Sequence, residues 1–122
     1  MEQALRASAW RDGSWYRVRT ARFEAAFVVS DEELDRVENV DVEVRLADGS
    51  RWTATVFTVA EVGRLMARWA DSGEALGGRY FWCSDGLIVR DAGITAITDV
   101  LSGLLDNGDF TSVLRRCVDE SS

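Results

Sequence analysis

The clearest pattern in the chain is the alternation of apolar and polar side chains over residues 40–46, with apolar residues at every even position. A period of two is expected for a strand that packs one face on a core and turns the other to water. A three-residue loop, Ala47-Asp48-Gly49 with Gly49 left-handed, sets Val44 opposite Trp52 and keeps one face apolar, whereas a two-residue loop sets Val44 opposite Thr53. We therefore predict an antiparallel hairpin over residues 40–59.

The residues before this hairpin predict further strands. Residues 15–22 read as a strand with Tyr16 and Val18 on one face, and residues 23–29 as a second strand or its continuation, with the odd positions apolar. Residues 2–10 contain good helix formers and also alternate, so a short helix and a strand both remain open there. The sequence does not place the break between the two strands.

Helix-start signals occur twice. Ser30 followed by Glu33, and Thr58 followed by Glu61, match the pattern in which the two side chains satisfy the free N–H groups of a first turn. The first predicts a short helix from Asp31 to Val37. The second predicts a helix over residues 59–72, which Gly73 ends. Its apolar residues recur on one face, and we expect that face to cover the hairpin.

A second hairpin is predicted over residues 79–90, around Ser84-Asp85-Gly86. In this register Phe81 lies opposite Val89, and the other side of the hairpin carries Tyr80, Trp82 and Ile88. Either a terminal helix covers these three residues or they form an exposed aromatic patch, and we favour the covering helix. Exposed tryptophan and tyrosine beside arginine are typical of an interface hot spot.

The pattern becomes helical after Asp91. One stripe runs from Ile94 to Leu105 until Asn107-Gly108 ends the helix, and Asp109 begins a last helix that extends to Val118. The prediction is a single α+β domain over residues 1–122. It contains a mainly antiparallel β-meander with helices packed on one face and two C-terminal helices.

Composition narrows the chemistry. The 122 residues include 14 basic and 21 acidic ones, for a net charge of −7, and there is no histidine or proline. Every basic residue is arginine. Without histidine the commonest general base and metal ligand are missing, so we expect no enzyme activity, cofactor or metal. The negative charge disfavours nucleic acid and anionic membranes and favours a basic protein partner.

The remaining signals have simpler explanations. Residues 15–22 are basic and aromatic, as in nucleic-acid-binding segments, but an exposed arginine face on an edge strand explains them better. Asp106-Asn-Gly-Asp109 lacks the alternating ligand spacing of a calcium loop. We read Cys83 and Cys117 as buried small hydrophobic residues. No apolar stretch resembles a signal peptide or a membrane span, so we expect a cytoplasmic protein.

One segment is strongly acidic. Residues 31–43 carry seven carboxylates against Arg36 alone. We expect them to form one negative surface across a helix and the outer face of the next strand, and to bind the partner. The predicted partner-binding residues are Asp31, Glu32, Glu33, Asp35, Glu38, Asp41, Glu43, Tyr80 and Trp82.

The segment Gly77-Gly-Arg-Tyr-Phe-Trp-Cys-Ser-Asp-Gly-Leu-Ile-Val-Arg90 and the apolar helix after it resemble small immunity proteins of bacterial polymorphic toxin systems. The resemblance covers residues 40–118. It implies a cytoplasmic, non-enzymatic inhibitor that neutralises a cognate toxin domain by binding it. The alternative is a structural or regulatory domain that self-associates through Tyr80, Trp82 and Ile88. The sequence leaves the oligomeric state open.

Overall fold

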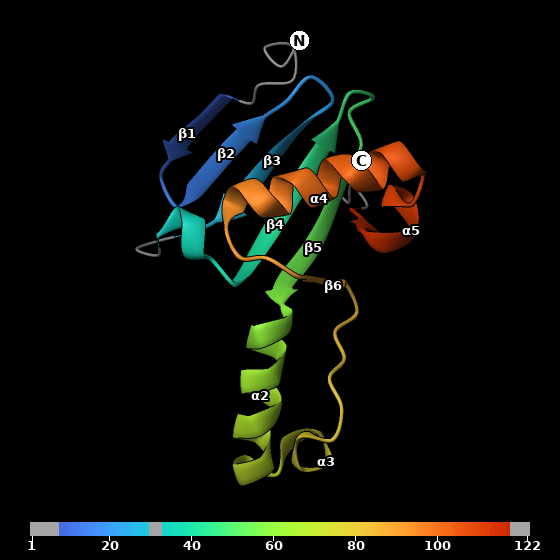
Figure 1. The fold of residues 1–122 in the computed structure, drawn as a ribbon. Helices are drawn as coiled ribbons and strands as arrows, with labels where there is room; N and C mark the ends of the chain where they lie inside the picture. The colour runs from blue at the N-terminus through green and yellow to red at the C-terminus, as the bar shows by residue number, and fades with distance from the viewer. Residues whose placement is uncertain (1–7, 30–32, 118–122) are drawn as a thin grey trace.

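Seven strands form one sheet in the computed structural model, which describes residues 8–29 and 33–117 (Figure 1). The strands are β1 (Ser8–Asp12), β2 (Trp15–Arg19), β3 (Phe23–Val28), β4 (Asn39–Leu46), β5 (Arg51–Thr58), β6 (Gly86–Val89) and β7 (Arg115–Arg116). The helices are α2 (Val59–Ser72), α3 (Glu74–Gly78), α4 (Ile94–Asn107) and α5 (Phe110–Val113), with a 3-10 helix, η1 (Leu34–Arg36). The predicted α+β class is confirmed.

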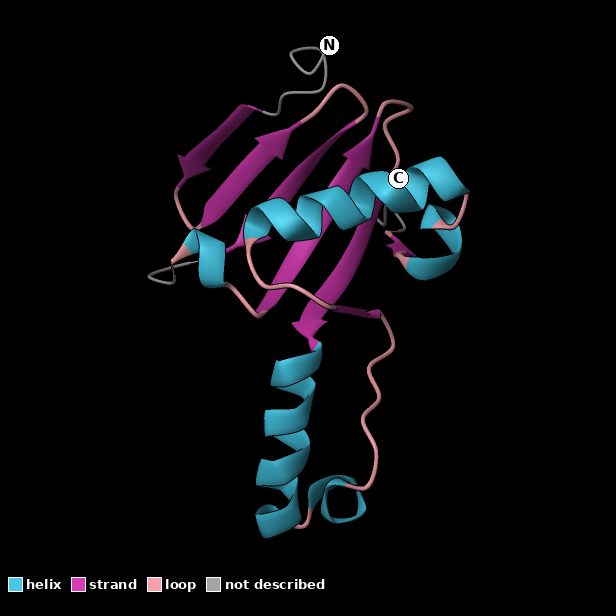
Figure 2. Cartoon of the chain, viewed as in Figure 1, coloured by secondary structure: helices cyan, strands magenta, loops and turns pink. Residues whose placement is uncertain are grey.

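The first five strands form an antiparallel meander in chain order. β6 then pairs with β5 in parallel, and β7 pairs with a different stretch of β5, opposite Trp52 and Thr53. Figure 2 shows the strands of this sheet gathered above the helix that projects below β5. The meander therefore places every strand from residue 8 to residue 58 beside its sequence neighbour.

The central hairpin has the predicted register. Val44 lies opposite Trp52 and Val42 opposite Ala54, and the Leu46 N–H donates to the Ser50 carbonyl at 2.9 Å to close the loop. Gly49 is left-handed, with φ of 89°. The upstream strands also present the predicted faces, since Val18, Phe23, Ala25 and Phe27 are all buried.

Helix α4 covers the apolar face of the sheet (Figure 1). Its buried residues Ile94, Ile97 and Leu101 belong to the same core as the valines of β4 and Phe27 of β3. The ring of Phe110 meets Trp52 edge-on, with centroids 5.8 Å apart, and extends this core toward α5. Within the described residues no helix covers the opposite face of the sheet, which we call the open face.

At the N-terminal side, one open alternative is decided and one expectation needs correction. Residues 8–12 form strand β1, one of the two alternatives left open for residues 2–10, and residues 2–7 lie outside the described residues. The helix predicted from Asp31 to Val37 is wrong where the structure describes it, because Glu33 is extended and only the three residues of η1 are helical. Val37 is extended and 3 % exposed, so the chain turns it into the core and ends the helical turn.

The covering role predicted for residues 59–72 is also wrong. The helix itself forms as expected, with the Thr58 hydroxyl accepting from the Glu61 N–H and with a left-handed Gly73 at its end. However, β5 ends at Thr58 and α2 begins at Val59, so no connecting residue allows the helix to fold back over the sheet. It instead projects beyond the end of β5, as Figure 1 shows.

The second hairpin does not form. Residues 79–85 return along α2 without becoming a strand, and only β6 joins the sheet, in parallel to β5. The predicted pairing of Phe81 with Val89 is therefore wrong. The last helix is also shorter than expected, because it ends at Val113 and Arg115 and Arg116 then pair with the part of β5 that β6 leaves free.

Candidate functional site

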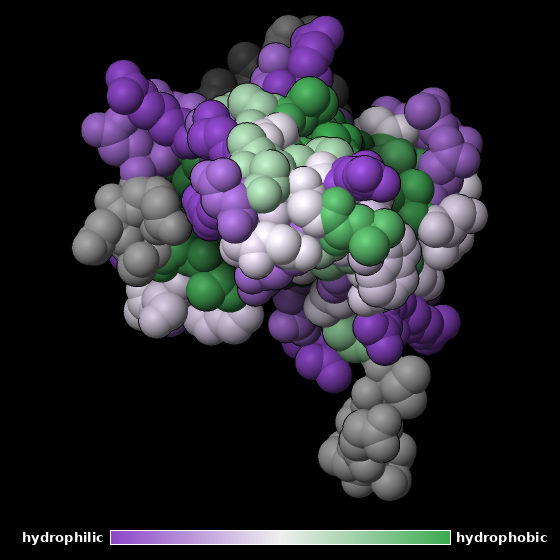
Figure 3. All heavy atoms as spheres, turned by 90° about the horizontal axis from the view of Figure 1, so that it is seen from below, coloured by the Kyte–Doolittle hydropathy of each residue, from purple (hydrophilic) through white to green (hydrophobic). Residues whose placement is uncertain are grey.

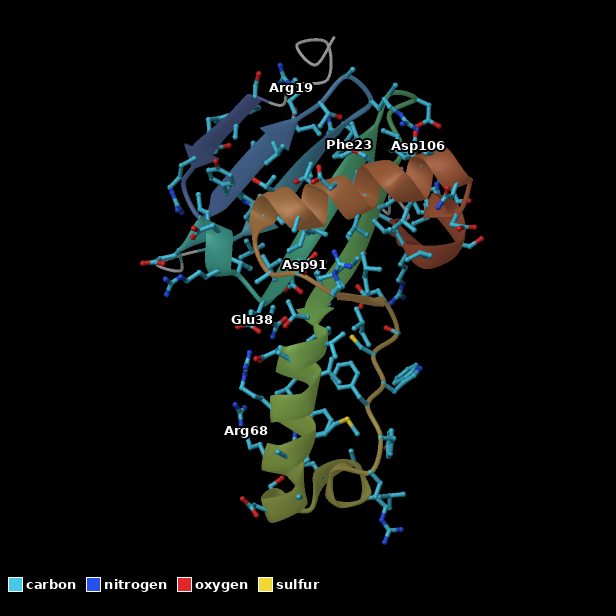
Figure 4. All side chains as sticks on the ribbon, viewed as in Figure 1. Arg19, Phe23, Glu38, Arg68, Asp91 and Asp106 are labelled. Carbon is cyan, nitrogen blue, oxygen red and sulfur yellow. The ribbon has the colours of Figure 1, made fainter. Side chains whose placement is uncertain are left out.

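The helix α2, the turn α3 and residues 79–85 together make a projection that we call the arm. None of the 14 residues of α2 is buried. Its apolar stripe packs on the returning segment, where the Phe81 ring stacks on Trp69 at 5.8 Å and meets Phe57 of β5 edge-on at 4.8 Å. Arg68 points away from this packing, on the far side of the helix (Figure 4). The arm thus has a small aromatic core of its own.

The tip of the arm turns tightly. Ala75 and Leu76 have left-handed backbone, with φ of 51° and 55°, although neither is glycine. Left-handed geometry costs an ordinary residue about 1–2 kcal/mol. At Gly78 an added Cβ would lie 2.0 Å from the Met66 carbonyl oxygen, so the chain crosses α2 too closely for any side chain. The tip is therefore a strained turn in which position 78 requires glycine. Backbone strain of this kind often occurs at functional sites.

The arm exposes large apolar side chains along its returning segment and beyond it. Trp82 is 74 % exposed, and Tyr80 and Ile88 are each 50 % exposed. We call these three residues the aromatic edge. The covering helix that we favoured from the sequence is wrong here, and the exposed patch is what the structure contains. Phe81 lies inward between Tyr80 and Trp82, so the alternation predicted for this segment holds without a second strand.

Exposure of this edge follows from the position of the arm. Because α4 and α5 both pack on the sheet, neither helix lies beside the arm (Figure 1). Seen from below, toward the free end of the arm, hydrophobic residues lie among hydrophilic ones (Figure 3). Leu76 at the tip adds to them, with 72 % of its surface exposed.

The acidic residues do not form the single surface that we expected. Asp31 and Glu32 lie outside the described residues. Asp35 borders a cleft beside α4, whereas Asp41 and Glu43 lie on the open face of the sheet. The alternation along β4 places its carboxylates on the side away from α4, and η1 lies on the side of α4. The sheet therefore separates the two groups.

The described acidic residues also differ in their partners. Glu33 pairs with Arg36 at 3.3 Å and Glu43 with Arg51 at 3.2 Å, and Asp41 accepts from the Thr55 hydroxyl at 3.0 Å. On the open face, the positive charge of Arg51 beside Glu43 reduces the negative potential. The open face is thus mixed in charge.

Glu38 holds the arm to the sheet. Its carboxylate accepts from the Thr58 hydroxyl at 2.8 Å and from Arg64 of α2, and its carbonyl accepts from the Thr58 N–H at 2.9 Å. The hydrogen bond from Thr58 and the guanidinium of Arg64 lower the pKa of Glu38. Figure 4 shows Glu38 at the base of α2. This predicted binding residue therefore has a structural task that the sequence did not indicate.

The basic and aromatic segment over residues 15–22 is not an edge strand, because β1 lies outside β2. Arg17 pairs with Asp12 at 2.9 Å and with Glu24 at 3.1 Å, and Arg19 pairs with Glu24 at 3.1 Å. The bond to Asp12 is the main cause of the raised pKa of Arg17. These arginines are thus occupied within the sheet.

The described ranges 8–29 and 33–117 also bear on the expectations for metal ligands, cysteines and membrane-spanning helices. No group of three or more carboxylates and thiols is placed to hold a metal ion there. Cys83 and Cys117 are both free and half-buried, which corrects our reading of them as buried residues. None of the described helices is long and apolar enough to cross a membrane.

No protein-family model, curated protein or solved structure matches this chain.

Proposed function

We propose that this chain is a non-enzymatic protein-binding module that contacts its partner through the aromatic edge of the arm. The observation that carries the proposal is the exposure of Trp82 and Tyr80, at 74 % and 50 %, on a projection with no other element over them. Tryptophan and tyrosine are the residues most enriched at interface hot spots. An exposed apolar patch with a polar surround is also a common mark of a protein interaction site.

The partner we propose is a basic protein, for example a toxin domain that this chain neutralises. The net charge of −7 favours such a partner, because opposite charges speed association and disfavour wrong partners. The resemblance to immunity proteins gives the same expectation. In this proposal the arm supplies apolar anchors and the acidic body supplies long-range attraction.

The test is coexpression with the product of the neighbouring gene, followed by calorimetric titration of the two purified proteins. Trp82→Ala should weaken binding by about 2 kcal/mol or more, which is roughly thirtyfold, because a hot-spot side chain is truncated. The matched control is Trp10→Ala, which removes an exposed tryptophan from β1 at the other end of the sheet. Equal binding by both variants and the wild type would contradict the proposal.

Exposure of Tyr80, Trp82 and Ile88 also favours a second candidate, self-association through the same edge. Light scattering over a concentration series separates the two. A monomer at high micromolar concentration supports a different partner, whereas a dimer that Trp82→Ala dissociates supports self-association.

A further inference from the structure

A cleft of about 700 Å³ lies between α4 and the β1–β2 side of the sheet. Helix α4 crosses the sheet obliquely and leaves this part of the apolar face uncovered (Figure 1). Half-buried Tyr16 and Leu34 supply apolar surface, the buried Val18 and Ile94 also line the cleft, and small residues such as Ala21 keep it open. Volumes of this size are typical of sites that bind a ligand or a short peptide.

The rim of the cleft is negative. Asp35 lies at the η1 end, Asp99 on the middle of α4 and Asp106 near its C-terminal end. Arg22 is the one basic residue of the lining, and it pairs with Asp106. Among the described residues Asp35 and Asp99 make no ion pair. Two carboxylates at separate points along the cleft therefore lack a cation.

The shape of the cleft indicates the kind of ligand. One face of α4, from Thr95 to Asp106, forms a wall. At a rise of 1.5 Å per residue these eleven steps span about 16 Å. An extended chain advances about 3.3–3.6 Å per residue, so the cleft accommodates roughly five residues. A chain of that length carries several cations, whereas a single small amine would meet only one of the separated carboxylates.

We propose that this cleft binds a short basic segment of the partner protein. The stems of arginine or lysine side chains lie on Tyr16 and Leu34, and their cations face Asp35 and Asp99. Long basic side chains commonly place their apolar stems on apolar surface in this way. The inference rests on the proposed function and deepens it, because it assigns the negative contact surface to the cleft instead of to the outer face of β4.

The test uses the whole chain and a fluorescein-labelled octapeptide of alternating arginine and leucine, with binding followed by anisotropy. The double variant Asp35→Asn/Asp99→Asn should bind the peptide at least about tenfold more weakly, because both unpaired charges are removed while side-chain shape is kept. The control variant Asp71→Asn/Glu74→Gln removes two exposed carboxylates of the arm and should bind like the wild type. A peptide with glutamate in place of arginine should not bind.

A second variant tests the cleft independently, in case the double variant does not fold. Thr95 is exposed on the cleft wall, and Thr95→Arg places both bulk and positive charge at the rim. It should also weaken peptide binding, and thermal melts establish that each variant is folded. Equal binding by the wild type and both cleft variants would overturn the inference, as would displacement of the peptide by spermine at the same concentration as by unlabelled peptide.

The identified partner distinguishes the two proposals. If Trp82→Ala weakens its binding and Asp35→Asn/Asp99→Asn does not, the cleft inference fails and the proposed function stands. If neither variant weakens binding, both fail.

Discussion

At the scale of single residues, Glu38, immediately before β4, joins the start of that strand to the end of β5 and to helix α2. It shares its carboxylate between Thr58, which is 2 % exposed, and Arg64, whose own pKa is raised mainly by the hydrogen bond to Glu38. Arg64 also contacts Glu61 at 3.0 Å. These contacts cross the point where the arm leaves the sheet, so they hold the base of the arm to the sheet.

The pKa of Glu38 gives a prediction for pH. Because its folded pKa is lower than the unfolded value of about 4.3, Glu38 stabilises the fold above that pH. This contribution is lost as the pH falls through the folded pKa. Glu38→Gln should therefore lower the melting temperature at pH 7, and its difference from the wild type should shrink as the pH falls below about 4.3. Melts recorded by circular dichroism from pH 7 to pH 2 measure this, and Glu33→Gln, which removes an exposed carboxylate, is the control.

At the scale of elements, the arm and the body differ in how much they bury. Ile97 of α4 is fully buried at 0 % exposed, whereas Trp69 of α2 is only half-buried and packs chiefly on Phe81. Segments with few buried apolar contacts open locally with smaller free energies than the core. The arm should therefore unfold locally while the sheet and α4 stay folded.

Two large-to-small substitutions test this difference. Ile97→Ala should cost about 2–5 kcal/mol of global stability, as expected for a core residue. Trp69→Ala should cost clearly less, while raising amide hydrogen exchange across residues 59–85 and leaving β3 and β4 protected. Denaturant titrations and hydrogen exchange measure the two effects. A global loss as large for Trp69→Ala as for Ile97→Ala would contradict the separation of the arm from the core.

At the scale of the whole molecule, the acidic segment around η1 and β4 and the apolar anchors occupy different places. The net charge is −7, and the carboxylates of the described residues 33–43 are divided among the cleft beside α4, the open face and the base of the arm. Tyr80 and Trp82 of the aromatic edge lie on the arm, and Ile88 lies on β6. Long-range attraction and short-range packing should therefore affect different steps of binding.

Kinetics of association with the partner test this separation. Raising the ionic strength from about 0.01 M to 1 M shortens the screening length from about 30 Å to 3 Å. The association rate should fall by roughly tenfold to a thousandfold, because steering by the acidic body is lost. Trp82→Ala should keep this salt dependence and mainly raise the dissociation rate. Stopped-flow mixing measures both rates, and an association rate independent of salt would argue against a basic partner.

Much of the fold follows from local patterns in the sequence. Alternation over residues 40–46 and the Asp48-Gly49 turn determine the register of β4 with β5, because a shift by one residue would turn every valine to water. The start of α2 at Thr58 and its end at Gly73 are equally local. The alternation of Tyr80, Phe81 and Trp82 likewise predicted which of the three faces inward.

Only the tertiary structure decided which surfaces meet. An apolar stripe on a helix shows that one side packs, but not against what, so α2 was expected on the sheet where α4 lies instead. The absence of a linker after Thr58 settles the direction of α2, and this direction leaves Trp82 exposed. Charge clustering in the sequence also failed to predict a common surface, because the sheet places Asp35 and Asp41 on opposite sides. Asp35 and Asp99 line the same cleft because the fold brings together segments more than sixty residues apart in the sequence. No local pattern contains this proximity.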